Sequence, residues 1–256
     1  MPDDLFDLYN KVAIVTGGGR GLGVPISNAL AARGSNIIIC SRKLKRCEEE
    51  ADRIISMGVR CKAVKCDVTN PKDVKNLSKV ALAEFGGVDI LVNNAGATWG
   101  GPVLDYPLES WKKVIDVNVT GMFLCCQEIG KVMVNQGGGK IINISSIFGV
   151  LGGDPSYMDA IAYNTSKGAI IAFTKDLAVK WGQYSINVNA VAPGFMLTDM
   201  TSSTIERHED QMLRHIPFKR LGKAEDLKGT IIFLASRASE YVTGQVLFVD
   251  GGWHVM

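Results

Sequence analysis

The chain has 256 residues, of which 46% are hydrophobic, and a formal net charge of +2 at neutral pH. This length suffices to bury a large core, and the near-balanced charge gives no reason to expect a nucleic acid or an anionic membrane as a partner. The first residues lack the basic start and apolar run of a secretory signal, and no apolar stretch is long enough to span a bilayer, so we expect a cytoplasmic protein. The six cysteines and three histidines show no metal-ligand spacing, so we predict buried free thiols and no metal site.

Short apolar segments alternate with longer helical patterns along the chain. No linker rich in proline or serine interrupts them, so we predict a single domain over residues 1–256, with residues 1–10 as an N-terminal extension. The predicted strands are residues 11–16, 36–40, 60–66, 88–92, 140–144, 185–191 and 245–249. The predicted helices are residues 24–33, 44–57, 74–85, 111–134, 163–181 and 224–235. This alternation predicts an α/β Rossmann fold, a doubly wound parallel sheet with helices on both faces.

A glycine-rich turn, Gly17-Gly-Gly-Arg-Gly-Leu-Gly23, joins the first predicted strand to the first predicted helix. Glycines let the backbone approach a phosphate there, and the helix N-terminus favours its negative charge. A merely flexible loop is the alternative, but strand and helix flank the glycines as a dinucleotide site requires. No Gly-Lys-Ser/Thr sequence ends the turn, which disfavours an NTP-hydrolysing P-loop. The predicted cofactor contacts in this turn are Gly17, Gly19, Arg20, Gly21, Leu22 and Gly23.

Small and polar residues also follow the other predicted strands. In doubly wound sheets, ligands bind at the carboxyl ends of the strands, which meet at one edge. The further cofactor contacts predicted at this edge are Ser41, Arg42, Asp67, Val68, Asn94, Ala95, Gly96, Pro193, Gly194 and Thr198. The sequence therefore indicates one continuous binding site.

Tyr163 and Lys167 are four residues apart at the start of a long apolar helix, so they share a helix face. A free tyrosine has a pKa near ~10 and is a poor proton donor or acceptor at neutral pH. We expect the Lys167 ammonium to lower the pKa of Tyr163 toward the working range of a general acid–base catalyst. Surface helices also produce this pair by chance, so its meaning depends on the surrounding motifs.

From Lys11 to Gly252 the chain resembles the short-chain dehydrogenase/reductase family. The matching motifs, in chain order, are Thr16 with the glycine turn, Asp67, Asn93-Asn-Ala-Gly96, Asn118-Val-Thr-Gly121, Ser146, the pair Tyr163 and Lys167, and Pro193-Gly194. The resemblance implies hydride transfer between a nicotinamide and a carbonyl carbon, interconverting a ketone and a secondary alcohol. It implies that Tyr163 is the general acid/base, and that Lys167 lowers its pKa and holds the nicotinamide ribose. It further implies that Ser146 orients the substrate carbonyl and that Asn118 anchors a water of a proton relay.

Two of these positions have a competing candidate nearby. Tyr157 is a second tyrosine, but Ile161 rather than a lysine follows it by four residues. Ser145 directly precedes Ser146, but the alignment with the family places Ser146 over the nicotinamide. The alternative is that either serine only caps a loop. The residues expected to contact substrate are Trp99, Ser146, Tyr157, Met158 and Phe195, with residues 197–222 as a lid. Because the segment from Ser146 to Tyr163 is longer than in most family members, substrate identity does not transfer readily.

The turn after the second predicted strand, Cys40-Ser41-Arg42-Lys43, carries no acid before Glu48. A carboxylate at that point binds the free ribose hydroxyls of NAD(H), whereas an arginine accommodates the 2′-phosphate of NADP(H). Arg42, together with Arg20 from the glycine turn, is the candidate phosphate contact. The alternative is that Arg42 belongs to a solvated helix start. We predict NADP(H) as the preferred cofactor, with NAD(H) possible.

Within the family, the sequence looks nearest to gluconate 5-dehydrogenase-like and 3-oxoacyl-carrier-protein-reductase-like enzymes. Gly137 and Tyr184 stand where carrier-protein reductases commonly present arginines, which counts modestly against a carrier-protein partner. A nucleotide-sensing protein without catalysis is less favoured because every catalytic residue is present, and the glycine spacing disfavours a sugar-nucleotide epimerase. The family resemblance and the strongly apolar helix at residues 111–134 predict a homo-oligomer, a tetramer by resemblance.

Overall fold

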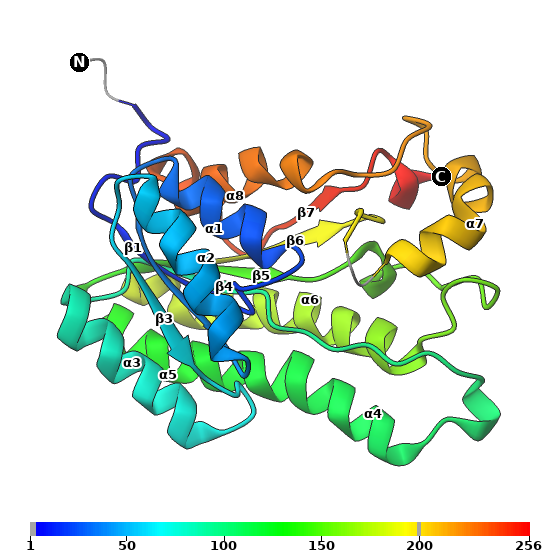
Figure 1. Cartoon of the computed structure of the whole chain (residues 1–256), viewed down its shortest axis with the longest axis horizontal. Helices are drawn as coiled ribbons and strands as arrows, with labels where there is room; N and C mark the ends of the chain where they lie inside the picture. Colours follow the sequence, from blue (N-terminus) through cyan, green and yellow to red (C-terminus); the bar gives the residue numbers. More distant parts are fainter. Residues whose placement is uncertain (1–3, 199–200) are drawn as a thin grey trace.

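The computed structural model describes residues 4–198 and 201–256. Its strands form one parallel sheet in the order β3-β2-β1-β4-β5-β6-β7 (Figure 1). The strands are β1 (Val12–Thr16), β2 (Asn36–Ser41), β3 (Cys61–Lys65), β4 (Ile90–Asn93), β5 (Gly139–Ile144), β6 (Ile186–Pro193) and β7 (Val246–Val249). The chain runs outward from β1 to β3 and then crosses to the other side of β1 at β4. This reversal creates a switch point between β1 and β4, where doubly wound sheets bind ligands.

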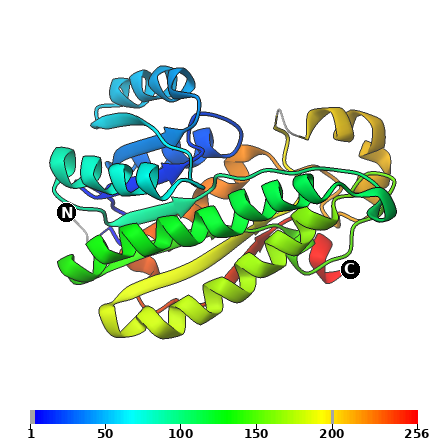
Figure 2. The same cartoon turned by 90° about the horizontal axis from the view of Figure 1, so that it is seen from below.

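Helices cover both faces of the sheet (Figure 1, Figure 2). They are α1 (Gly23–Ala31), α2 (Leu44–Ser56), α3 (Pro71–Phe85), α4 (Leu108–Ile115), α5 (Gly121–Gln136), α6 (Ile161–Trp181), α7 (Ser202–Arg214) and α8 (Lys228–Ala235). Alternate residues of β1 serve two cores: Ile14 packs on the side of α3, α5 and α6, whereas Val15 packs on the side of α1, α2 and α8. The predicted doubly wound sheet is confirmed.

Two differences from the predicted segments bear on the site. The predicted helix at residues 111–134 begins earlier, at Leu108, and a π-helical turn at Asp116–Thr120 joins α4 to α5. In that turn the Gly121 N–H donates to the carbonyl of Asp116, five residues back, which widens the helix locally. The predicted lid contains α7, which the sequence did not reveal because only Ile205 and Met212 of that helix are buried.

The described part of the N-terminal extension packs against the body of the protein. Leu8 is fully buried beside α1, and its N–H donates to the carbonyl of Arg33 at 3.0 Å. Among residues 4–198 and 201–256, no helix combines the length and hydrophobicity that crossing a membrane requires.

Candidate active site

Hydrogen bonds tie the glycine turn between β1 and α1 to the end of β4. The Thr16 hydroxyl accepts from the N–H groups of Asn94 and Ala95, both at 3.0 Å, and the Asn94 side chain donates to the Thr16 carbonyl at 2.9 Å. Gly17 has a positive φ of 67°, and a Cβ on Gly23 would lie 2.3 Å from the Gly17 carbonyl oxygen. Glycine is therefore required at both positions, and the turn presents backbone N–H groups at the switch point.

The other predicted cofactor residues lie at neighbouring strand ends. Asp67 follows β3, and its carboxylate accepts from the N–H and hydroxyl of Thr69 at 3.0 and 2.8 Å. Val68 is buried against Gly121. At the end of β6, the Gly194 N–H donates to the carbonyl that ends β7 at 3.0 Å. The sheet therefore gathers these residues along one edge, as predicted.

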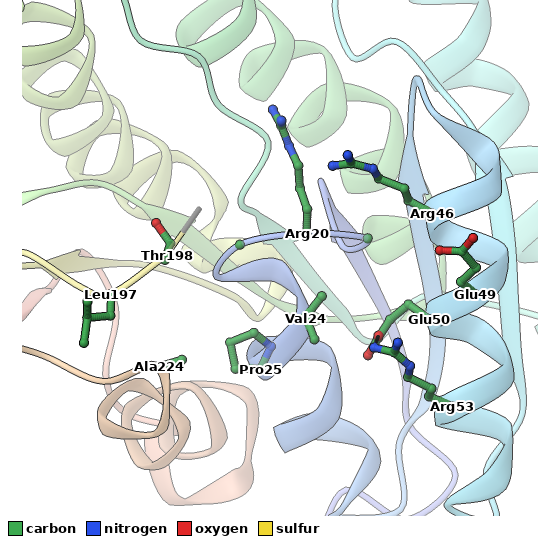
Figure 3. Close-up of a pocket in the computed structure, with 12 residues that line it drawn as sticks. Arg20, Val24, Pro25, Arg46, Glu49, Glu50, Arg53, Leu197, Thr198 and Ala224 are labelled. Carbon is green, nitrogen blue, oxygen red and sulfur yellow. Dashed lines mark hydrogen bonds and ion pairs between the residues drawn. The ribbon is translucent and has the colours of Figure 1, made fainter. Parts of the chain in front are cut away.

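A cavity of about 440 Å³ lies beside the glycine turn and is bordered by α1, α2 and residues 197–198. Arg20 from the turn and Arg46 from α2 both line this cavity, and the Arg46 side chain points toward Arg20 (Figure 3). Arg42 is exposed and does not border the cavity. The structure thus brings Arg20 together with Arg46, a residue that the sequence reasoning missed. The sequence feature that could have identified Arg46 is its position in the first turn of the predicted helix at residues 44–57.

Ser146 and Tyr163 meet where β5 ends and α6 begins. Burial raises the pKa of the Tyr163 phenol, and a hydrogen bond with the Ser146 hydroxyl opposes this by lowering it. The Ser145 hydroxyl instead donates to the carbonyl of Lys167 at 2.9 Å, which holds β5 against α6. Of the two serines, only Ser146 therefore lies beside the phenol.

Lys167 is buried near the phenol, and its ammonium donates a hydrogen bond to the backbone. Nζ donates to the Ile144 carbonyl at 2.8 Å and lies 5.2 Å from the centroid of the Tyr163 ring. Burial lowers the pKa of Lys167 to about 8. The pKa of the Tyr163 phenol is nevertheless raised from its ordinary value rather than lowered, because burial of the phenol is the largest effect on it. The phenol is consequently protonated at neutral pH.

Asn118 lies in the π-helical turn and uses its side chain to join two segments. Its Oδ1 accepts from the Ala97 N–H at 2.7 Å, and its Nδ2 donates to the Ala97 carbonyl at 2.9 Å and to the Ser166 hydroxyl at 2.8 Å. The Ser166 hydroxyl donates in turn to the Tyr163 carbonyl at 2.7 Å. Both amide protons of Asn118 are engaged, and these contacts hold the loop after β4 against α6.

Most of the predicted substrate residues belong to one aromatic cluster. The Tyr157 ring lies 6.1 Å from Phe195 and 6.5 Å from Trp253, measured between centroids, and Met158 packs on the same cluster. Trp99 is 46% exposed and makes no ring contact with the cluster among the described residues. The structure therefore brings together three of the four aromatic or methionine side chains predicted for substrate.

The sequence reasoning missed two members of this region, Trp253 and His208. Trp253 follows β7, so the rule that strand ends line the site identifies it in retrospect. His208 comes from α7, where its φ of −133° breaks the helical geometry, and its ring lies 6.1 Å from that of Tyr157. No local pattern in the sequence indicates that contact.

Comparisons with known proteins agree with this architecture. The family model described as enoyl-(acyl carrier protein) reductase matches residues 17–254. An uncharacterized oxidoreductase of Escherichia coli, YgcW, is 43% identical over 254 residues, which cover 98% of this chain and 95% of the relative. The 2-dehydro-3-deoxy-D-gluconate 5-dehydrogenase of Bacillus subtilis is 40% identical over 257 residues, covering 98% and 97%. The 3-oxoacyl-(acyl-carrier-protein) reductase of Synechocystis is 40% identical over 247 residues, covering 96% and 97%.

A solved structure also resembles this chain in sequence and fold. The gluconate 5-dehydrogenase of Burkholderia cenocepacia, crystallised in complex with NADP and tartrate, is 33% identical to this chain. It superposes with a TM-score of 0.94 over 99% of this chain and 98% of its own. The match of sequence and fold over nearly the whole length shows that the chain belongs to the short-chain dehydrogenase/reductase family of oxidoreductases.

Proposed function

We propose that this protein is an NADP(H)-dependent oxidoreductase that interconverts a ketone and a secondary alcohol, with Tyr163 as general acid and base. The observation that carries the proposal is the hydrogen-bonded pair of the buried Ser146 and the partly exposed Tyr163, at the sheet edge that also holds the glycine turn. The bound nicotinamide supplies or accepts the hydride. In the reducing direction, the protonated Tyr163 phenol donates its proton to the ketone oxygen, while the Ser146 hydroxyl stabilises the charge that develops there.

Lys167 and Asn118 support this proton transfer without donating the proton themselves. The Lys167 ammonium lies 5.2 Å from the phenol ring in a buried environment, so it stabilises the phenolate that remains after the proton has left. The ammonium also has donors left over from its bond to Ile144, and these suit the hydroxyls of a nicotinamide ribose. Asn118 acts as a positioning residue, because its amide fixes the loop after β4 against α6.

The charge around the glycine turn supports NADP(H) as the preferred cofactor. Arg20 and Arg46 line the cavity beside the turn, and no acidic residue follows β2 before Glu48. A 2′-phosphate there accepts charge-assisted hydrogen bonds. The related gluconate 5-dehydrogenase was crystallised with NADP.

We propose a small sugar acid or a similar polyhydroxy ketone as the substrate, with a 3-oxoacyl thioester as the second candidate. Relatives with both activities are about equally similar to the chain. The lack of basic residues at Gly137 and Tyr184 favours the first, because an acidic carrier protein needs cations at its docking surface. Residues 197–222, with α7, are proposed as the lid over this substrate. The proposal includes a homo-oligomeric assembly and, because all six cysteines are free thiols, a cytoplasmic location.

The experiment is a panel of sugar acids, simple ketones and 3-oxoacyl thioesters, assayed by the absorbance of the reduced nicotinamide. Tyr163→Phe should lower kcat by ~10²–10⁴-fold and leave cofactor binding nearly intact, since the phenol is the proposed proton donor. Tyr157→Phe is the matched control and should change KM more than kcat. Retention of more than about a tenth of wild-type kcat in Tyr163→Phe would remove that residue from the role.

A further inference from the structure

We infer that Arg46 binds the 2′-phosphate of NADP(H) together with Arg20, and that Arg46 rather than Arg42 is the main α2-side residue that discriminates NADPH from NADH. The inference rests on the proposed function. It concerns a position that neither the sequence motifs nor the turn after β2 indicated.

The first reason is the packing of α2 against the glycine turn. A Cβ on Gly19 would lie 3.1 Å from the backbone carbon and oxygen of Arg46, so the first turn of α2 lies directly against the glycine turn. Arg46, Glu50 and Arg53 recur at helical spacing and all border the cavity. The side chain of Arg46 therefore leaves α2 on the face that looks across to Arg20 (Figure 3).

The second reason is the balance of charge in the cavity. Arg53 pairs with the buried Glu50 at 3.3 Å, so that pair is neutral. Among the described residues, neither Arg20 nor Arg46 has a carboxylate within ion-pair distance. Two adjacent guanidinium groups repel each other, whereas a dianionic phosphate between them forms charge-assisted bonds with both. The exposed carboxylate of Glu49 also borders the cavity and opposes the anion.

Arg42 differs from Arg46 in position and not in chemistry. Both arginines are exposed, but of the two only Arg46 borders the cavity that Arg20 also borders. Arg42 precedes α2, whose first residue is Leu44, and it is not among the residues that line the cavity. The chain thus offers a matched control four residues away.

The test is calorimetric titration of the full-length protein with adenosine 2′,5′-bisphosphate and with 5′-AMP, which differ only in the 2′-phosphate. Arg46→Gln should weaken binding of the bisphosphate by about 10- to 100-fold and leave 5′-AMP binding unchanged. Arg42→Gln should weaken it by less than about 3-fold, and Glu49→Gln should strengthen it because it removes an opposing charge. The ratio of kcat/KM with NADPH to kcat/KM with NADH should change in the same order.

The outcomes separate this inference from the proposed function. If wild type binds both nucleotides equally, the proposed NADP(H) preference fails and the inference fails with it. If wild type binds the bisphosphate more tightly than 5′-AMP and Arg46→Gln retains the whole of this difference, the inference is overturned and the proposed function stands. A loss in Arg42→Gln as large as that in Arg46→Gln also overturns it. Arg46→Lys, which keeps the charge but not the forked donor geometry, should retain only part of the preference.

Discussion

Replacement of Lys167 by methionine should destroy turnover and yet stabilise the protein in the absence of cofactor. Lys167 is 5% exposed, and within residues 4–198 and 201–256 its ammonium makes one hydrogen bond, to the Ile144 carbonyl at 2.8 Å. Methionine is also unbranched and flexible, so it fills most of the same space without a charge. The substitution therefore isolates the energetic cost of keeping this charge inside the fold.

The size of the effect follows from the pKa of Lys167. Burial lowers that pKa from 10.5 to about 8, and one pKa unit corresponds to about 1.4 kcal/mol, so at neutral pH the charge costs the folded state about 3 kcal/mol. Against this, the Ile144 carbonyl loses its donor, which costs about 1–3 kcal/mol. The net gain in the free energy of unfolding is about 1 kcal/mol, or about 2–4 °C in Tm for a chain of this size.

The sign of the effect depends on pH. Below pH 8 the folded protein carries the buried charge, and the cost is fully present; as pH rises from about 8 toward 10.5, the folded protein releases the proton first and the cost disappears. Near pH 10 most of this cost has gone and the lost hydrogen bond is the larger effect, so Lys167→Met should then be less stable than wild type.

The assay is thermal unfolding of the cofactor-free protein at pH 7 and pH 10, at one protein concentration because assembly shifts Tm. Lys175→Met, at an exposed position on the same helix, is the control and should leave Tm unchanged at both pH values. If Lys167→Met were destabilised equally at pH 7 and pH 10, the buried charge would not carry the cost argued here.

Three further predictions concern the cofactor, a buried acid and the assembly. Ser41→Asp combined with Arg42→Ser should move the kcat/KM preference toward NADH, because a carboxylate at that turn favours ribose hydroxyls and repels a phosphate; an unchanged preference would contradict this. Burial raises the pKa of Glu50, so wild type loses stability as pH rises above the unfolded pKa near ~4.3. Glu50→Gln has no such carboxyl group, so its free energy of unfolding, measured with urea and compared with that of wild type, should increase from pH 5 to pH 8. A constant difference between the two proteins would contradict this. Light scattering at micromolar concentration should show a homo-oligomer, in keeping with the 43% exposed Phe123 on α5, and a species of only 27.6 kDa would refute it.

Much of the site is predictable because its signals are local. The glycine turn must carry glycines, since a Cβ on Gly23 meets the Gly17 carbonyl, and a short sequence records that steric demand. Tyr163 and Lys167 are neighbours through helical spacing alone. Parallel strands end at one edge of the sheet, so the order of strands and helices already places Asn94 and Ser146 near each other.

Other features depend on contacts between segments far apart in the chain. Whether Arg42 or Arg46 faces Arg20 depends on the rotation of α2 against the glycine turn, which no periodicity records. The α7 helix has too few buried residues to show an apolar pattern, and the proximity of His208 to Tyr157 spans separate elements.

The sequence by itself therefore determined the doubly wound sheet, the edge at which it binds a ligand, and the identity of the residues at the strand ends. Only the tertiary structure decided the protonation behaviour of Tyr163 and Lys167 on α6. The pKa of Tyr163 is raised and that of Lys167 lowered by burial, and burial is the sum of many distant contacts. Helical spacing places Tyr163 and Lys167 on one helix face. How far the rest of the fold excludes water from each side chain determines which of them carries a charge.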